Sequence, residues 1–145
     1  MPDGTIDSKE IAVLDQIAAW LKINGEAIYE TRPWTLYGEG PNQIESGSFK
    51  GTTIKALGSK DFRFTRNKAN TVIYAICLGW PYGDTQIASL GLSSKTNPGK
   101  VQNVTVLGSE ASIKWTQGAD AMHLQLPRQS RAVNDFGAAI KIMLN

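Results

Sequence analysis

The sequence predicts a mainly β protein, an antiparallel β-sandwich of about eight short strands preceded by one N-terminal amphipathic α-helix. Three observations lead to this prediction. Apolar residues recur at helical spacing near the N-terminus, the period changes to two after about residue 60, and turn signals interrupt this alternation every eight to twelve residues or so. Short strands at such intervals are typical of sandwiches and barrels.

The composition fits one folded domain and excludes several functions. Of 145 residues, 41% are hydrophobic and 19% charged, as in globular proteins. The net charge of +2 is not gathered in any run of Lys and Arg, so we expect no nucleic-acid partner. Neither a signal peptide nor an apolar run of about 18 residues is present, and we expect no membrane partner.

The predicted helix spans about residues 7–23. Asp7 and Glu10 have the spacing of a capping box, and Asn24 with Gly25 marks the end, where we expect glycine to take the left-handed conformation. Two apolar strips follow the helical period: Ile11, Leu14, Ala18 and Leu21, and Val13, Ile17 and Trp20. This wide apolar arc predicts packing on more than one side.

A domain boundary is expected after the helix. Residues 26–42 contain two prolines and no clean period, which is typical of a linker. The charge also changes: residues 1–30 carry six acidic and two basic side chains, and the remainder carries seven and thirteen. We therefore divide the chain into residues 1–34 and residues 35–145.

The strands of the second part follow from alternating apolar residues. The alternation covers the segments 62–64, 72–78, 104–106, 113–115, 122–126 and 140–144. Turn signals separate them, among them 58–61, 67–70, 80–84, 97–99, 108–110 and 117–120. Antiparallel pairing through short connections is the expected arrangement.

Few residues suggest catalysis. His123, the only histidine, alternates with Met122 and Leu124, so we interpret it as a solvated residue on the outward face of a strand rather than as a general base. Cys77, the only cysteine, lies in an apolar run and is interpreted as buried. We expect neither a metal site nor a cofactor.

Glycoside hydrolysis requires a carboxylate pair about 5 to 9.5 Å apart. The carboxylates from residue 39 onward lie in predicted turns or at strand edges, where we expect them to be solvated: Glu39, Glu45, Asp61, Asp84, Glu110, Asp120 and Asp135. Aromatic rings can stack on sugars or fill a core. Weak candidates for sugar stacking are Trp80, Tyr82 and Trp115.

Several segments resemble glycoside hydrolase family 29 α-L-fucosidases. The longest is AWLKINGEAIYETRPW at residues 19–34, preceded by DGTI at 3–6. The resemblance continues through DFRFT (61–65), VIYAICLGWP (72–81), VTVLG (104–108), IKW (113–115) and LQLP (124–127). Residues 132–142 match the last strand of the family only loosely.

The resemblance implies that residues 1–34 are the last helix of a catalytic barrel and its exit linker, and that residues 35–145 are the C-terminal β-sandwich domain. In that family the nucleophile, the acid/base and the fucose-binding histidines all precede the matching region. The leading hypothesis is therefore a non-catalytic C-terminal portion that supports a fucosidase barrel, in cis or in trans, and is inactive alone. Residues expected to join helix and sandwich are Asn24, Glu26, Tyr29, Arg32 and Trp34, with Arg32 pairing with Glu26 or Glu30.

Two alternatives stay open. The sandwich is a carbohydrate-binding module for a fucosylated glycan, or the chain is a self-associating structural domain. In the second case the uncovered surface around Leu14, Ile17 and Leu21 favours a homo-oligomer or a helix folded back on the sandwich. The compartment is unspecified by the sequence, although the resembling family is often periplasmic, secreted or lysosomal.

Overall fold

The computed structural model describes residues 6–42, 56–81, 83–96, 98–126 and 136–145. Helix α1 (Ser8–Asn24) continues into a 3₁₀ turn, η1 (Gly25–Ala27), and a second 3₁₀ turn is η2 (Ala88–Leu90). The strands within these residues are β1 (Thr31–Glu39), β2 (Phe62–Asn67), β3 (Val72–Cys77), β4 (Gly83–Ile87), β5 (Val101–Val106), β6 (Lys114–Gln117), β7 (Met122–Leu126) and β8 (Ala138–Leu144).

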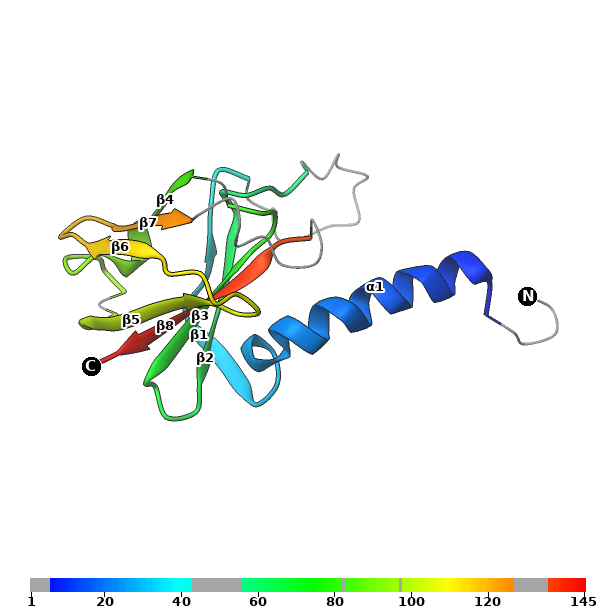
Figure 1. Cartoon of the computed structure of the whole chain (residues 1–145). Coiled ribbons are helices and arrows are strands. Elements are labelled where there is room, and N and C mark those ends of the chain that lie inside the picture. The colour runs from blue at the N-terminus through cyan, green and yellow to red at the C-terminus, as the bar shows by residue number, and fades with distance from the viewer. Residues whose placement is uncertain (1–5, 43–55, 82, 97, 127–135) are drawn as a thin grey trace, which may run out of the picture.

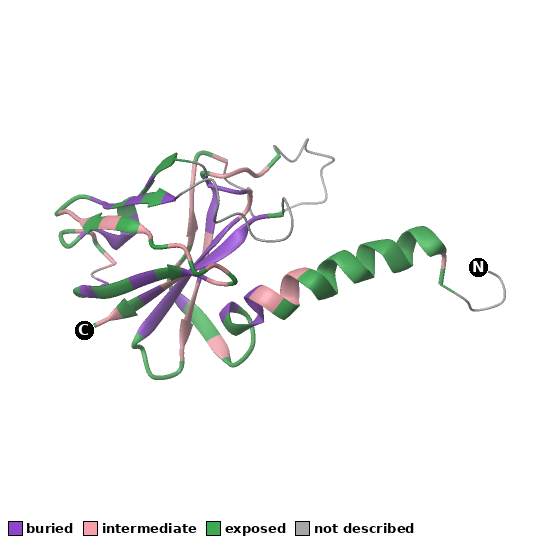
Figure 2. Cartoon of the chain, viewed as in Figure 1, coloured by how far each residue is buried: buried purple, intermediate pink, exposed green. Residues whose placement is uncertain are grey.

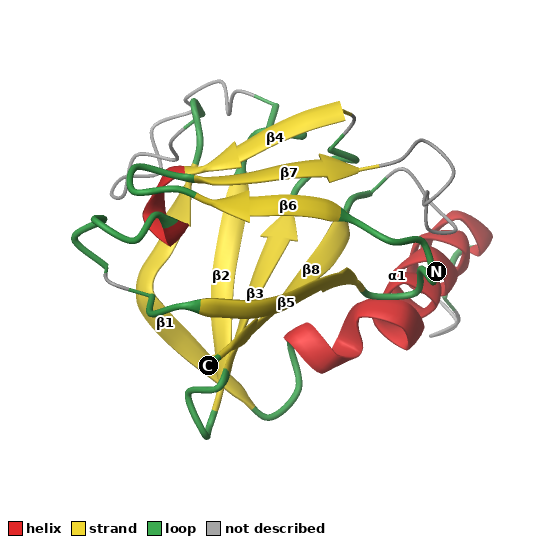
Figure 3. Ribbon diagram, turned by 60° about the vertical axis from the view of Figure 1, so that its left-hand side comes forward, coloured by secondary structure: helices red, strands yellow, loops and turns green. Residues whose placement is uncertain are grey.

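The strands form two antiparallel sheets packed face to face (Figure 3). The larger sheet has the order β1-β2-β3-β8-β5, and the smaller has the order β4-β7-β6. Each strand pair is antiparallel. The predicted fold class, a mainly β sandwich with one N-terminal helix, is confirmed.

The core lies between the two sheets. Alternate strand residues point into this core, as β7 shows most clearly: Met122, Leu124 and Leu126 are buried, and the residues between them are exposed. In β3, by contrast, all six residues are buried. Its second face packs with Trp20 and Ala27, so the root of α1 covers the outer face of the larger sheet.

Helix α1 begins as predicted and ends differently. Asp7 caps the helix and forms the capping box with Glu10. At the other end Gly25 is right-handed, with φ −58°, so the predicted left-handed stop is wrong. The chain continues instead through η1, and Glu30 takes the positive φ of 57°. A Cβ atom at position 25 would lie 2.8 Å from the Tyr29 ring, so this exposed ring would have to shift to admit a side chain there.

Helix α1 projects away from the sandwich and touches it only at its C-terminal end (Figure 1). Exposure along its length is high until the last turns (Figure 2). A helix folded back on the sandwich, one of the expected arrangements, is therefore wrong for this chain. Within the described residues, no helix combines the length and apolar content of a membrane span.

Two strands, β1 and β4, were not predicted from the sequence. β1 lies in the expected linker, so the boundary after Trp34 falls within a strand that pairs with β2. Pro33 is tolerated there because β1 is an edge strand and needs no second partner. β4 begins at Gly83, inside an expected turn, and its residues 83–87 pair with β7.

Candidate functional site

The C-terminal end of α1 is fastened to the larger sheet by Trp20, Asn24, Glu26 and Ala27, called here the helix anchor. The indole nitrogen of Trp20 donates to the Gly137 carbonyl at 3.1 Å. Asn24, only 1% exposed, donates through Nδ2 to the Trp20 carbonyl at 3.1 Å and accepts at Oδ1 from the Ala139 backbone N–H at 2.9 Å. Asn24 thus joins the last helical turn to β8.

One row of side chains across three strands receives the rest of the helix anchor. Thr65, Tyr74 and Lys141 are register neighbours on β2, β3 and β8. Thr65 donates its hydroxyl to the Ala27 carbonyl at 2.6 Å. The Tyr74 hydroxyl and the Lys141 ammonium both donate to Oε1 of Glu26, at 2.8 and 2.5 Å.

These contacts fix the charge states at the helix anchor. The hydrogen bond from Lys141 is the main cause that lowers the pKa of Glu26, and the Tyr74 hydroxyl adds to it against the opposing effect of burial. Burial raises the pKa of Tyr74, and the hydrogen bond to Glu26 and its negative charge raise it further. The Glu26 carboxylate is therefore ionised and the Tyr74 phenol neutral near pH 7.

Two glycines with positive φ allow close approaches near the root of α1, one to the helix and one to the end of β3. Gly137 has φ +98°, and a Cβ atom there would lie 2.0 Å from the Cys77 carbonyl oxygen. Gly108 has φ +75°, and its Cβ would lie 2.3 Å from Cγ2 of Ile23. A side chain at position 108 would push against Ile23 at the root of α1, whereas one at position 137 would collide with the backbone at the end of β3.

Beyond the helix anchor, α1 carries an uncovered apolar surface. Its side chains are about half exposed: Ile11 47%, Val13 56%, Leu14 51% and Ile17 50%. A hollow of about 300 Å³ lies beside this surface, lined by Val13, Gln16, Ile17, Trp20 and Phe136. Contiguous exposed apolar patches on proteins are typical of interaction sites.

Of the residues expected to join helix and sandwich, the structure brings Asn24 and Glu26 to the helix anchor. Trp34 lies in the core, where its ring meets Phe64 edge to face at 5.2 Å. Tyr29 and Arg32 are exposed. Of the two carboxylates expected to pair with Arg32, Glu26 and Glu30, Glu26 forms its ion pair with Lys141 instead.

Sequence reasoning missed the partners of the helix anchor. In the sequence, Trp20 belongs to an apolar strip, and its indole N–H gives no indication of a distant acceptor. Tyr74 and Lys141 lie on strands 48 and 115 residues away from Glu26. The available signal was Tyr74 itself, because the hydroxyl of a buried tyrosine usually has a hydrogen-bond partner.

Two of the three sugar-stacking candidates lie within the described residues. Trp80 is 4% exposed and belongs to the core, so its ring offers no face to a sugar, which corrects its assignment as a surface candidate. Among the described residues its buried Nε1 has no hydrogen-bond partner. Trp115 is half-buried and packs against the core, and Tyr82 lies outside the described residues.

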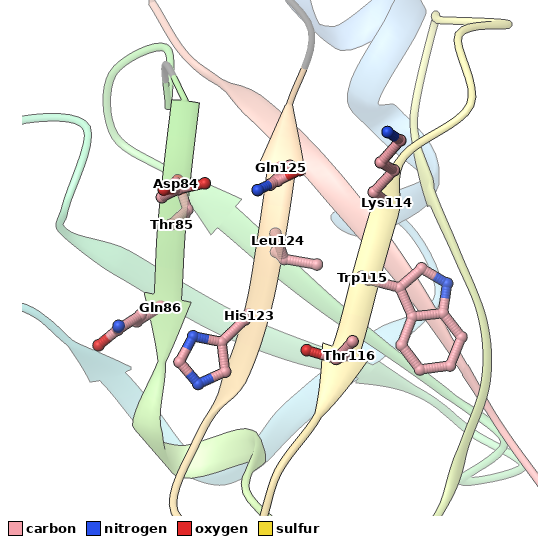
Figure 4. Close-up of a pocket in the computed structure, with 9 residues that line it drawn as sticks. All are labelled: Asp84, Thr85, Gln86, Lys114, Trp115, Thr116, His123, Leu124 and Gln125. Carbon is pink, nitrogen blue, oxygen red and sulfur yellow. The ribbon is translucent and has the colours of Figure 1, made fainter.

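The outer face of the smaller sheet carries a polar recess of about 430 Å³. Six outward side chains form two rows across β4, β7 and β6 (Figure 4). The register gives the first row as Asp84, Gln125 and Lys114 and the second as Gln86, His123 and Thr116. The predicted outward position of His123 is confirmed.

Two predicted surface carboxylates have structural partners. Asp61, 1% exposed, accepts hydrogen bonds from Gly58 N–H at 2.8 Å and from the Asn42 backbone and amide at 3.0 and 3.1 Å, so the prediction of a solvated Asp61 is wrong. Burial raises the pKa of Asp61, but these hydrogen bonds outweigh it and hold the pKa below its ordinary value. Glu39 accepts from Ala88 and Ser89 N–H, both at 2.8 Å.

The remaining reactive groups are inert or scattered. Cys77 is buried, as predicted, and burial is the main cause that raises the pKa of its thiol to about 12. In the part of the chain that the structure describes, no group of three His, Cys, Asp or Glu residues could hold a metal ion.

This combination defines an accessory domain, a small β-sandwich that holds a protruding apolar helix. Residues 56–143 match the family model described as the alpha-L-fucosidase C-terminal domain, and the chain belongs to this family. Tissue alpha-L-fucosidase of Homo sapiens is 30% identical over 129 residues, which cover 87% of this chain and 22% of that protein. The protein of the same name from Mus musculus is 32% identical over 101 residues, 70% and 17% of the two chains.

Solved structures show the same fold. Thermotoga maritima alpha-fucosidase in complex with fucose superposes with a TM-score of 0.67 at 21% identity, over 97% of this chain and 28% of that one. Alpha-L-fucosidase isoenzyme 1 from Paenibacillus thiaminolyticus gives 0.62 at 21% identity, over 98% and 28%. The chain thus spans between 17% and 28% of the length of these proteins.

Proposed function

We propose that this chain supports the catalytic barrel of an α-L-fucosidase, with α1 as the last helix of that barrel and the sandwich as its holder. The chain is the non-catalytic C-terminal part of such an enzyme, and the barrel is its partner in cis or in trans. The main support is the contrast along α1: four half-exposed apolar side chains precede a helix anchor that is hydrogen-bonded to the larger sheet, in part through the buried Asn24.

The energetics favour a partner for α1. Complete burial of one Val, Leu or Ile side chain contributes about 1.5 to 3 kcal/mol. Ile11, Val13, Leu14 and Ile17 realise only about half of this in the chain by itself. A barrel that covers this surface would add the remaining burial free energy. Because the helix anchor already fixes the position of α1, association with the barrel would cost less conformational entropy.

The absence of activity in the chain by itself is directly testable. Purified chain incubated with an aryl α-L-fucoside is expected to release no aryl product above the buffer rate. Turnover that co-purifies with the chain through repeated chromatography would contradict the proposal.

The supporting role can be tested with a fusion protein in which this chain replaces the matching C-terminal segment of Homo sapiens tissue alpha-L-fucosidase. We expect a soluble fusion that hydrolyses the aryl fucoside. Ile17→Asp should lower its soluble yield and melting temperature, because the new charge would lie in the barrel interface.

Ser93→Asp is the matched control, since it adds the same charge at an exposed loop residue after η2. It should leave yield and melting temperature unchanged. Equal behaviour of the Ile17→Asp and Ser93→Asp fusions would refute a barrel contact at α1.

A further inference from the structure

We propose that the outer face of the smaller sheet binds a neutral oligosaccharide. This site consists of the two polar rows on β4, β7 and β6, called here the polar face, and it differs from the aromatic candidates that the sequence suggested. Cross-strand neighbours on one face of a sheet lie about 4.5 to 5.5 Å apart, a spacing that suits several hydrogen bonds to one sugar ring.

The charges of the polar face favour a neutral ligand. Asp84 and Lys114 flank Gln125 in the first row, so one negative and one positive side chain offset each other. The second row contributes the amide of Gln86 and the hydroxyl of Thr116 on either side of His123. A phosphate or sulfate group would require an excess of cations, which this face does not offer.

The hydrogen-bonding groups match hydroxyls in particular. The two amides each present an acceptor oxygen and two N–H donors, Thr116 can donate and accept, Asp84 accepts, and Lys114 donates. A sugar hydroxyl donates one hydrogen bond and accepts others, so adjacent hydroxyls can pair with such mixed groups. A uniformly acidic or basic face could satisfy only half of these bonds.

The available space exceeds a single sugar ring. The recess over the polar face measures about 430 Å³, and a second hollow of about 490 Å³ shares Asp84, Thr85 and Gln86 with it. Ser59 and Lys60 line the far side of that second hollow. Because β4 borders both hollows, a chain of several sugars could cross it from β6 toward the turn before β2.

The polar face remains open when α1 is covered. The helix anchor contacts the outer face of the larger sheet, through β2, β3 and β8. The smaller sheet packs on the opposite side of the core (Figure 3). A barrel around α1 would therefore leave the polar face accessible to a glycan, although sugar binding itself does not depend on the barrel.

The test is isothermal titration calorimetry on the full 145-residue chain. The probes are 2′-fucosyllactose, lactose and cellotetraose as neutral sugars and 3′-sialyllactose as a charged one, each up to roughly 10 mM. We expect saturable heat with at least one neutral sugar. Gln125→Ala and His123→Ala should each weaken binding by about tenfold, whereas Thr105→Ala, an exposed change on β5, should not.

Three results would overturn the proposal: no saturable heat with any neutral sugar, stronger binding of sialyllactose than of the neutral probes, or equal affinity of the polar-face variants and the parent chain. Circular dichroism of each variant verifies the fold, because both substituted residues are exposed. These measurements need no barrel, so their failure is distinct from failure of the barrel fusion.

Discussion

At the scale of single residues, the Asn24 amide joins α1 to β8 in a buried position. Asn24→Ala would leave the Ala139 N–H buried without its acceptor. An unsatisfied buried group of this kind costs about 1 to 3 kcal/mol, and we expect the free energy of unfolding to fall by that amount in urea titrations. Gln16→Ala, an exposed amide on the same helix, should change it by less than about 0.5 kcal/mol.

Asp61 makes the free energy of unfolding depend on pH. Its pKa in the folded chain lies below the ordinary 3.8, so its contribution to stability is present above pH 3.8 and is lost as pH falls from there through the lower folded value. In Asp61→Asn the free energy of unfolding should decline less steeply with falling pH in this range. Parallel curves for parent and variant, measured by urea unfolding at several pH values, would rule out this role.

The contacts of individual residues could be predicted where a local sequence pattern determines them, but not where they depend on partners far away in the sequence. Asp7 and Glu10 are three residues apart, and their capping box followed from spacing alone. The ion pair of Glu26 with Lys141 requires β8 to lie beside β3, which no local pattern specifies. Trp80 was ambiguous because an indole serves equally in a core and on a surface.

At the scale of elements, α1 presents apolar surface that the chain leaves uncovered. We expect the chain to self-associate weakly through this surface when no barrel is present. The double variant Val13→Ser/Ile17→Ser should shift the sedimentation coefficient toward the monomer at high protein concentration. Its sandwich should remain equally stable, because both side chains lie beyond the helix anchor; a weight-average mass unchanged by the substitutions would disprove association through α1.

The elements with strong periodicity were predicted and two weak ones were not. β7 alternates buried and exposed residues throughout, which identifies a strand from sequence. β1 carries Pro33 and an irregular register between Pro33 and Gly38, and these features remove the alternation. β4 is short and opens with a glycine at φ +67°, so local signals favoured a turn there.

At the scale of the whole molecule, the two halves of α1 should contribute unequally to stability. Deletion of residues 1–16 removes mostly exposed helix and should leave the unfolding free energy of the sandwich nearly unchanged. Deletion of residues 1–27 removes the helix anchor and uncovers Val72, Tyr74 and Ile76. The loss should reach about 3 kcal/mol or more, as measured by tryptophan fluorescence in urea, and equal stability of the two truncated chains would contradict this division.

In the proposed arrangement, α1 transmits the orientation of the helix anchor to a catalytic barrel. Seventeen residues at about 1.5 Å each give a length of about 25 Å, pivoted at Asn24 and Trp20. A tilt of about 5° at that pivot would displace the Asp7 end by roughly 2 Å, enough to misplace catalytic groups by a damaging distance. A substitution that only reorients the pivot could therefore impair a distant active site while the sandwich remains fully stable.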